Sequence, residues 1–306
     1  MDDSDDSDFY GSPKTVSKLK SRVAAYNTLS YWNSQPARIK LITSRLTPSE
    51  SASQSPPAAG RLHNAYSSIP HAAYQLTESI PQFLARLPPA TTNCRPGLEW
   101  IFIANPYLSP RPHSDHDRFM KAGGERLDLF KSFIDNTNAA YPSSPFVAKR
   151  HIAVARKEAM EDLKRLAVDC HKTSGKWMLF PDTAFVNEVW EKVVRAVAHN
   201  QLGTAAKVAT RMPTGYDDGH GEKNNRLICV YTDNFTDKDD VARVLKRMKE
   251  LELVKQGPGA RLIYYKADAW TELGIYGENE LGIKASMYNS KEIFEHIKEV
   301  AEKKTF

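Results

Sequence analysis

The chain has 306 residues, of which 41% are hydrophobic and 26% charged, as in an ordinary soluble globular protein of one or two domains. No apolar run approaches the roughly 18 residues of a membrane span. The N-terminal sequence MDDSDDSDFYGS also lacks the basic-then-apolar order of a secretory signal. Three widely spaced cysteines argue against a disulfide framework and favour a reducing compartment. We therefore expect no membrane association and a location in the cytoplasm or also in the nucleus.

The charge distribution favours an anionic partner. The formal net charge is +5, but the first eight residues hold five aspartates and no base. Without those five negative charges, the rest of the chain carries +10. Such a surface would attract RNA or nucleotides. The alternative is that these charges are spread over the whole chain and make only a solvated surface.

The N-terminal part divides into segments of different composition. Residues 1–13 are too polar to fold and are expected to form a disordered acidic tail. Residues 14–94 form an N-terminal extension, with a short helix predicted over 14–33 and a flexible Ser/Pro/Ala-rich linker at 47–60. Residues 61–93 indicate either a short helical arm or an irregular strap on the main domain.

The main domain is expected to cover residues 95–306. Alternation and turn signals predict strands at 98–106, 176–180, 204–211, 226–233 and 260–268, with another near 285–289. Helical spacing predicts helices at 125–135, 154–171, 185–199, 236–253 and 290–304. Three of these helices have expected N-caps: Asp182 or Thr183, a capping box of Thr236 with Asp239, and Ser290.

The order of these elements predicts an α+β fold. A sheet with helices on one face would bury the apolar side of each element. The 14-residue loop between the strands at 204–211 and 226–233 holds no crossover helix, which favours antiparallel pairing.

Two of the predicted strands carry a candidate ligand site. Lys207 and Arg211 point to the same side of their strand, and Tyr231 lies on the next strand. If the strands pair, these three side chains could share a surface, with the small Ala209 leaving room for a ligand. Two cations beside an aromatic ring suit a phosphate and a stacked base. The alternative is the solvent side of a half-exposed sheet.

The tryptophans have mostly structural interpretations. Trp177 alternates with Lys176, so we expect Trp177 in the core and Lys176 on the opposite face with the other cations. Trp190 is expected on the buried side of its helix. Trp270 follows a strand and could serve as a stacking platform for a base, with core packing as the alternative.

No motif indicates an enzyme. The segment PHSDHD, residues 112–117, holds two histidines and two aspartates, which are metal-ligand types, but a solvated loop is the alternative. Cys170 and His171 are helix neighbours and point in different directions, and no phosphate-binding loop or serine elbow is present. We expect no catalysis, no metal and no cofactor; a hydrolase that uses residues 112–117 is a weaker hypothesis.

Several segments resemble known families. SGKWMLF, AAKV, ICVYTDNF and LGIY, within residues 95–290, are similar to an uncharacterised family of basophilic-leukemia-expressed proteins. The block from Gly175 to Leu251 also resembles translation initiation factor 4E, through its Gly-basic-Trp strand, its Trp-bearing helix and its strand ending in arginine. This resemblance implies a curved antiparallel sheet with helices on the convex face. Cap-binding relatives hold a methylated guanine nucleotide on the concave face.

The resemblance implies roles for individual residues. Lys176 matches a cation near the cap phosphates, and Arg211 matches a direct phosphate ligand. Tyr231 matches the tryptophan that touches the methyl group of the base. Arg226 lies one position from the register of a phosphate-binding lysine.

One departure from the cap-binding pattern changes the implied function. The relatives stack the base between two tryptophans, and a glutamate follows the second; here the corresponding position falls near Leu166, where no Trp-Glu occurs. Each lost stacking partner would cost roughly 1–3 kcal/mol. We therefore expect a non-catalytic RNA- or nucleotide-binding protein without the usual cap recognition. The alternative is a protein-interaction adaptor that has lost nucleotide binding and holds a partner peptide on its convex helices.

Overall fold

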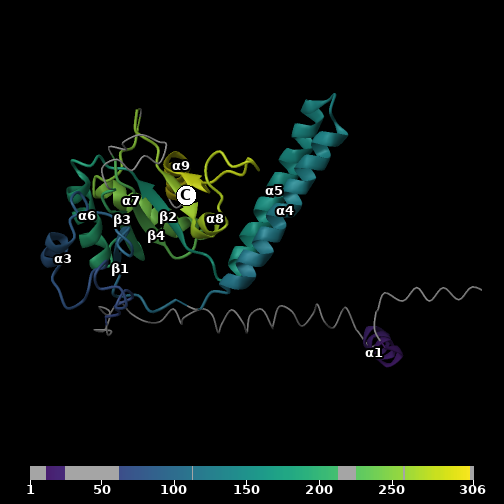
Figure 1. The fold of residues 1–306 in the computed structure, drawn as a ribbon, viewed down its shortest axis with the longest axis horizontal. Helices are drawn as coiled ribbons and strands as arrows, with labels where there is room; N and C mark the ends of the chain where they lie inside the picture. The colour runs from purple at the N-terminus through teal and green to yellow at the C-terminus, as the bar shows by residue number, and fades with distance from the viewer. Residues whose placement is uncertain (1–11, 25–61, 112, 213–224, 258, 304–306) are drawn as a thin grey trace, which may run out of the picture. The chain divides into compact units, whose positions relative to one another are not determined.

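The computed structural model describes residues 12–24, 62–111, 113–212, 225–257 and 259–303 (Figure 1). The chain divides into two compact units, residues 1–59 and 60–306. The described part of the first unit is the exposed helix α1 (Pro13–Ala24). The predicted N-terminal helix is confirmed as far as Ala24. The rest of that helix, the acidic tail to residue 11 and the linker at 47–60 lie outside the described residues.

The second unit is an α+β fold around a six-stranded antiparallel sheet of order β1-β3-β4-β2-β5-β6. Its strands are β1 (Trp100–Ala104), β2 (Gly175–Leu179), β3 (Ala205–Ala209), β4 (Ile228–Thr232), β5 (Tyr264–Ala267) and β6 (Tyr288–Asn289). Its helices are α3 (Ile80–Arg86), α4 (His116–Ala140), α5 (Pro145–Asp169), α6 (Val186–Ala198), α7 (Lys238–Glu250), α8 (Asp268–Glu272) and α9 (Ser290–Lys303). The predicted α+β class and antiparallel pairing are confirmed. None of the described helices is long and apolar enough to cross a membrane.

One face of the sheet forms the core. Alternate apolar residues of the strands are fully buried on this face, where α6 packs on β1 and β3 and α7 packs on β4. Trp177 and Trp190 are completely buried, as predicted. The indole of Trp177 donates a hydrogen bond to the Val241 carbonyl at 3.1 Å, which ties the central strand β2 to α7.

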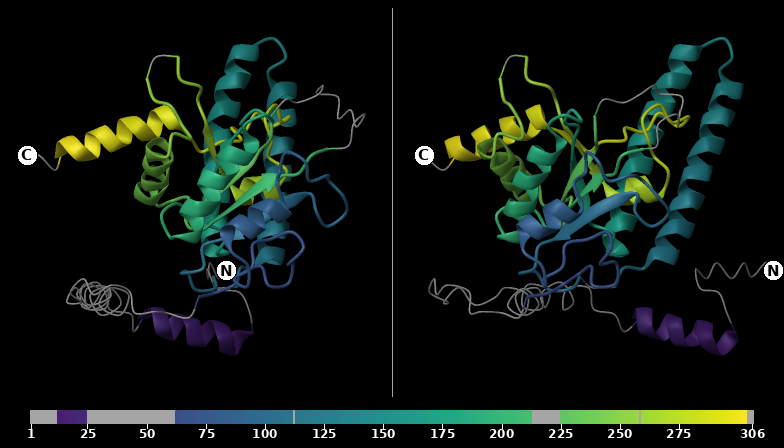
Figure 2. Two further views of the ribbon diagram at one scale, coloured as in Figure 1. Left: turned by 90° about the vertical axis from the view of Figure 1, so that its left-hand side faces the viewer. Right: turned by 60° about the vertical axis from the view of Figure 1, so that its left-hand side comes forward.

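Helices α4 and α5 form a long antiparallel hairpin between β1 and β2, and it projects away from the sheet (Figures 1 and 2). The sequence predicted shorter helices, at 125–135 and 154–171. The Gly123-Gly124 pair does not end α4, because Gly123 provides a close contact: a Cβ there would lie 2.8 Å from a methyl carbon of Leu273.

All three predicted helix caps are displaced. Helix α6 begins after Phe185, and Asp182 instead accepts a hydrogen bond from the Ala184 amide within the preceding turn. Asp237 rather than Thr236 caps α7. Ser290 is the first helical residue of α9, and its hydroxyl accepts from the Ile263 amide. A neighbouring polar side chain takes the place of the predicted cap at α7 and α9, where Asp237 and Asn289 accept from backbone amides, whereas α6 begins without a side-chain cap.

The compact unit begins at Gly60, whereas the sequence placed the domain boundary at Arg95. The difference arises because Ala72, Phe83 and Leu87 are buried in the same core as the sheet. Residues 62–79, which we call the strap, run beside β1, where Ala72 and Tyr74 exchange backbone hydrogen bonds of 2.9 Å with Phe102. The irregular strap, one of the two alternatives for this segment, is therefore the observed one, followed by the short helix α3.

Candidate functional site

The second face of the sheet, opposite α6 and α7, carries three lysines, and we call it the lysine face. It is formed by the residues that alternate with the core residues: Trp100 and Phe102 on β1, Lys207 on β3, Cys229 and Tyr231 on β4, Lys176 and Met178 on β2, and Tyr264 and Lys266 on β5. Lys176 pairs across the strands with Tyr231 and with Lys266, and Lys207 pairs with Cys229. Lys207 and Tyr231 are thus diagonal neighbours, roughly 7–8 Å apart. The prediction that Lys176, Lys207 and Tyr231 share one face is confirmed.

Lys176 is already paired with a carboxylate. Its Nζ donates to Asp268 Oδ1 at 2.5 Å and to the Thr271 hydroxyl at 3.2 Å. It also lies 5.8 Å from the centre of the Tyr231 ring. A phosphate at this ammonium would have to compete with Asp268.

Lys207 has no such carboxylate. Its Nζ lies 4.1 Å from the centre of the Trp100 ring, and it makes no hydrogen bond or ion pair with the rest of the described chain. Burial lowers the pKa of Lys207. A partly buried ammonium without a counter-charge is unfavourable, so an anion placed beside it would be stabilised.

Lys266 is a member of the lysine face that the sequence analysis missed. Only 6% of its surface is exposed, and its Nζ lies 4.2 Å from the centre of the Tyr276 ring. Burial, and then the adjacent Lys176 ammonium, lowers the pKa of Lys266 to about 8. The alternation of Tyr264 and Lys266 along the predicted strand was the signal that could have placed it on this face.

The two remaining polar groups on β4 stay uncharged near neutral pH. Burial raises the pKa of the Cys229 thiol to about 11, and burial also raises the pKa of Tyr231. Cys229 is buried, on the lysine face beside Lys207. Tyr231 therefore offers a neutral ring and a hydroxyl to a ligand.

A cleft of about 1230 Å³ opens beside Tyr231, at the end of the sheet where β4 finishes. Its walls include Tyr66 from the strap, Ala205 from β3 and Asp268. Arg111 closes one side, where it forms an ion pair of 2.8 Å with Asp233 and donates to the Thr232 carbonyl at 3.3 Å. The cleft thus combines two tyrosines with charged groups of both signs.

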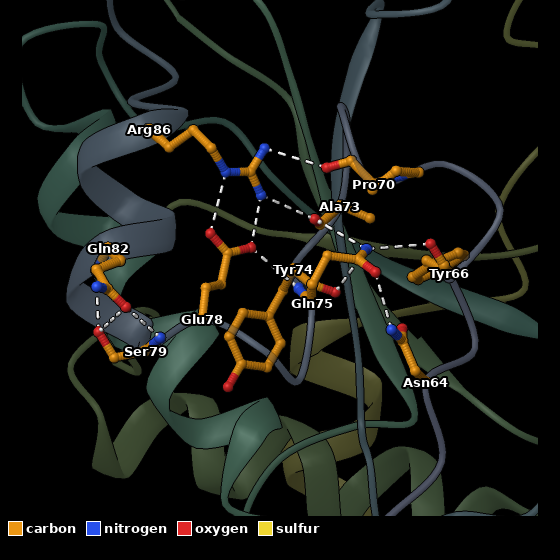
Figure 3. Close-up of polar contacts among 10 residues, drawn as sticks. All are labelled: Asn64, Tyr66, Pro70, Ala73, Tyr74, Gln75, Glu78, Ser79, Gln82 and Arg86. Carbon is orange, nitrogen blue, oxygen red and sulfur yellow. Dashed lines mark hydrogen bonds and ion pairs between the residues drawn. The ribbon is translucent and has the colours of Figure 1, made fainter.

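Part-buried and exposed hydrogen bonds hold the strap together around Tyr66 (Figure 3). The Tyr66 ring lies 5.3 Å from the Phe102 ring, and burial raises the pKa of its phenol. Gln75 donates to the Tyr66 carbonyl at 3.1 Å, and Asn64 donates to Gln75 at 2.8 Å. Arg86 donates to Glu78 at 2.6 Å and 3.0 Å.

Arg86 also reaches back over the strap. It donates to the carbonyls of Pro70 and Ala73, each at 3.1 Å (Figure 3). One guanidinium therefore joins α3 to two points of an otherwise irregular segment. The sequence pattern could not predict this, because the strap has no periodicity and its partners lie far along the chain.

A family model described as "Basophilic leukemia-expressed protein Bles03" matches residues 19–274. The chain belongs to this family. The Bles03 match covers the strap, the α4–α5 hairpin and all three lysines of the lysine face. It ends before Tyr276, whose ring covers Lys266.

Two of the predicted phosphate ligands, Arg211 and Arg226, do not converge with Tyr231. Ala205 lies opposite Tyr231, and Arg211 follows six residues later, past the end of β3, which puts it roughly 20 Å along the strand direction. Burial lowers the pKa of Arg226, and the charge of Arg211 lowers it further, so the two guanidinium groups act on each other and not on Tyr231. The expected grouping of Arg211 with Lys207 and Tyr231 is therefore wrong, since it ignored the length of the strand.

Trp270 does not lie where the sequence predicted a base-stacking residue. It lies on α8, is completely buried, and packs near Phe235 with ring centres 6.4 Å apart. A ligand cannot stack on a side chain that the core already covers. The proposed role of Trp270 as a stacking platform is therefore wrong.

The histidine- and aspartate-rich segment at the start of α4 makes structural contacts. Asp115 caps α4 by accepting from the Arg118 amide at 3.2 Å, and His116 lies 3.2 Å from a Glu272 carboxylate oxygen. The described residues contain no group of three or more histidine, cysteine, aspartate or glutamate side chains that could hold a metal ion.

Proposed function

We propose that this chain is a non-catalytic RNA- or nucleotide-binding protein with the curved-sheet fold of translation initiation factor 4E. One observation carries the proposal: Lys207 has no carboxylate partner among the described residues, and it lies diagonal to Tyr231, which lines a large cleft. Small-molecule sites typically occupy roughly 300–1,000 Å³, so this cleft has room for a nucleotide.

The residues around the cleft suggest how such a ligand would lie. A phosphate near Lys207 would supply the counter-charge that this ammonium lacks. The base would then lie against Tyr231, with Tyr66 forming the opposite wall and Ala205 leaving space between them. Stacking on an aromatic side chain tolerates any base, which fits RNA or nucleotides better than one particular base.

The proposed fold rests on the order of elements and on the SGKWMLF strand, which forms the centre of the sheet. The site differs from that of the cap-binding relatives at Leu166, which is half-buried on α5 and packs against the core. A leucine at this position cannot supply the second base-stacking ring that the cap-binding relatives use. We therefore propose binding that does not depend on a methylated cap.

Titration with fluorescent capped and uncapped RNA at two salt concentrations tests the proposal. We expect similar binding of both RNAs at low salt, and weaker binding at high salt because phosphate contacts release counterions. Tyr231→Leu should weaken binding by roughly 5- to 150-fold, the equivalent of 1–3 kcal/mol of stacking. Lys207→Ala should also weaken it, whereas Lys246→Ala on the exposed side of α7 should not. No binding at low salt, or unchanged binding in Lys207→Ala, would contradict the proposal.

The second candidate function is a protein-interaction adaptor, and the α4–α5 hairpin favours it. Leu129 is 65% exposed and lines an apolar groove of about 350 Å³ with Phe133 and Val154. An amphipathic helix of a partner protein, with apolar residues at helical spacing, could pack there as a third helix. Trp190 is buried and cannot contribute to such a surface.

The adaptor function is tested by capture of partner proteins with two variants. Leu129→Asp combined with Val154→Asp should abolish capture of a partner that Lys207→Ala still captures. Capture that is unchanged by the two aspartates would exclude the hairpin groove as the docking site.

A further inference from the structure

Lys266 has the environment of a reactive amine. The residue is 6% exposed, and its side-chain amine makes no hydrogen bond and no ion pair within the described part of the chain. Its cross-strand neighbour Lys176 takes the nearest carboxylate, Asp268, at 2.5 Å. Lys266 is therefore left beside a second ammonium in a dry site, which favours its neutral, nucleophilic form.

The cover over this amine is a surface side chain. The Tyr276 ring, centred 4.2 Å from Lys266 Nζ, is itself 57% exposed. A rotation of one tyrosine side chain would open the amine to a small molecule, without any change in the sheet. Burial thus keeps water from stabilising the charged form of the amine. A small reactant could still enter where the exposed Tyr276 ring lies over the amine.

The neighbours of Lys266 favour an anionic reactant. Lys176 and Lys207 contribute two ammonium groups to the lysine face, and within the described chain one carboxylate, that of Asp268, pairs with Lys176. A phosphate or carboxylate group on a small molecule would be attracted to this excess positive charge.

We propose that Lys266 forms an imine with the carbonyl carbon of a small anionic aldehyde or ketone. The neutral amine nitrogen attacks the carbonyl carbon, and proton transfer gives a carbinolamine. Loss of its hydroxyl group with a proton as water leaves the C=N bond, so one water is released and nothing is oxidised or reduced. The reaction is reversible, and it gives Lys266 a covalent binding role that is separate from nucleotide recognition at Tyr231.

Pyridoxal 5′-phosphate, an anionic aldehyde, is the probe for this reaction. The folded full-length chain is incubated with increasing probe, the imine is trapped with sodium borohydride, and the modified lysines are identified by peptide mass spectrometry. We expect Lys266 to be modified at a probe concentration at least ten times lower than the exposed Lys246 or Lys298. Pyridoxal, which lacks the phosphate, should modify Lys266 only at a higher concentration than pyridoxal 5′-phosphate does. At Lys246 the concentrations that the two aldehydes require should differ less.

Two variants sharpen the test. Tyr276→Ala removes the cover and should speed modification of Lys266 several-fold while leaving Lys246 unchanged. Lys266→Arg keeps the positive charge, removes the amine, and should abolish the modification that occurs at low probe. Modification of Lys266 only at the concentrations that modify Lys246 would overturn the proposal. The labelling of wild-type protein decides between these outcomes even if a variant fails to fold. The experiment uses no RNA, so its result is independent of the RNA titration.

Discussion

Lys176 and Asp268 form an ion pair of 2.5 Å between β2 and the start of α8, across 92 positions of the sequence. The pair ties the central strand to the C-terminal part of the sheet. Among the described residues, Asp268 is the carboxylate that pairs with a lysine of the lysine face, and Lys207 and Lys266 have no such partner there.

Replacing Asp268 tests how much the fold depends on this pair. Asp268→Asn should lower the free energy of unfolding by about 2–3 kcal/mol, because the Lys176 side chain is only 8% exposed and would become an unpaired buried charge. Urea denaturation measures the change. As a control, Glu280→Gln breaks the highly exposed pair of Glu280 with Lys131 and should change the free energy of unfolding much less than Asp268→Asn does. Equal small losses in both variants would mean that Lys176 is well solvated.

The pH dependence of stability should report on Lys266. Its pKa is about 8 in the folded chain and about 10.4 in an unfolded one, so the unfolded chain binds more protons between these values. Wild-type stability should therefore rise, relative to Lys266→Met, as the pH increases from 8 to about 10.4. At pH 7 the methionine variant should be more stable by about 1–3 kcal/mol. Paired urea titrations at pH 7 and pH 9.5 check this. The stability advantage of the methionine variant should shrink between these pH values, and an advantage that grows would contradict the lowered pKa of Lys266.

Two glycines should respond in opposite ways to alanine. A Cβ at Gly175 would lie 2.1 Å from the Tyr265 hydroxyl, so Gly175→Ala must displace a buried ring and should cost about 1–3 kcal/mol or more. A Cβ at Gly124 meets nothing within 4 Å in the middle of α4. Gly124→Ala should instead stabilise the chain by about 0.5–1 kcal/mol. Thermal unfolding of both variants is the measurement, and a stable Gly175→Ala would mean that Tyr265 can move.

Arg86 should control the order of the strap. Arg86→Ala removes its bonds to Glu78, Pro70 and Ala73, so the amides of residues 62–79 should exchange hydrogen faster. Hydrogen-exchange mass spectrometry would localise the change. Arg243→Ala, which breaks an exposed pair within α7, is the matched control and should leave the strap unchanged. If strap exchange does not change in Arg86→Ala, other contacts hold Tyr66.

The regular part of the fold was predictable because its signals are local. Alternation along β2, β3 and β4 placed Trp177 in the core and Lys176 on the other face, and the loop length gave the antiparallel pairing. The same alternation could have added Lys266. Helix ends were less predictable: near α7, both Thr236 and Asp237 can cap, and only the backbone geometry decides between them.

The site was predictable only in part because its remaining members depend on distant contacts. Tyr66 lines the cleft because Gln75 and Arg86 hold the strap in place by hydrogen bonds to the carbonyls of Tyr66 and Ala73. The strap itself has no periodicity that would predict this. Asp268 neutralises Lys176 from a different element, which no pattern near SGKWMLF indicates. Trp270 followed a strand, as expected, but the turn into α8 points it into the core.

The strand order has a consequence for how the chain folds. Strand β1 pairs with β3, which is made about one hundred residues later, whereas α4 and α5 in between contact each other directly. Because local contacts form faster than distant ones, the α4–α5 hairpin should become helical before β3 is available to pair with β1. During synthesis the apolar residues Ile101 and Ile103 would be exposed throughout that interval. We therefore expect a chaperone that protects the nascent chain to bind at β1. Slow pairing of β1 with β3 would make β1 the first segment to aggregate.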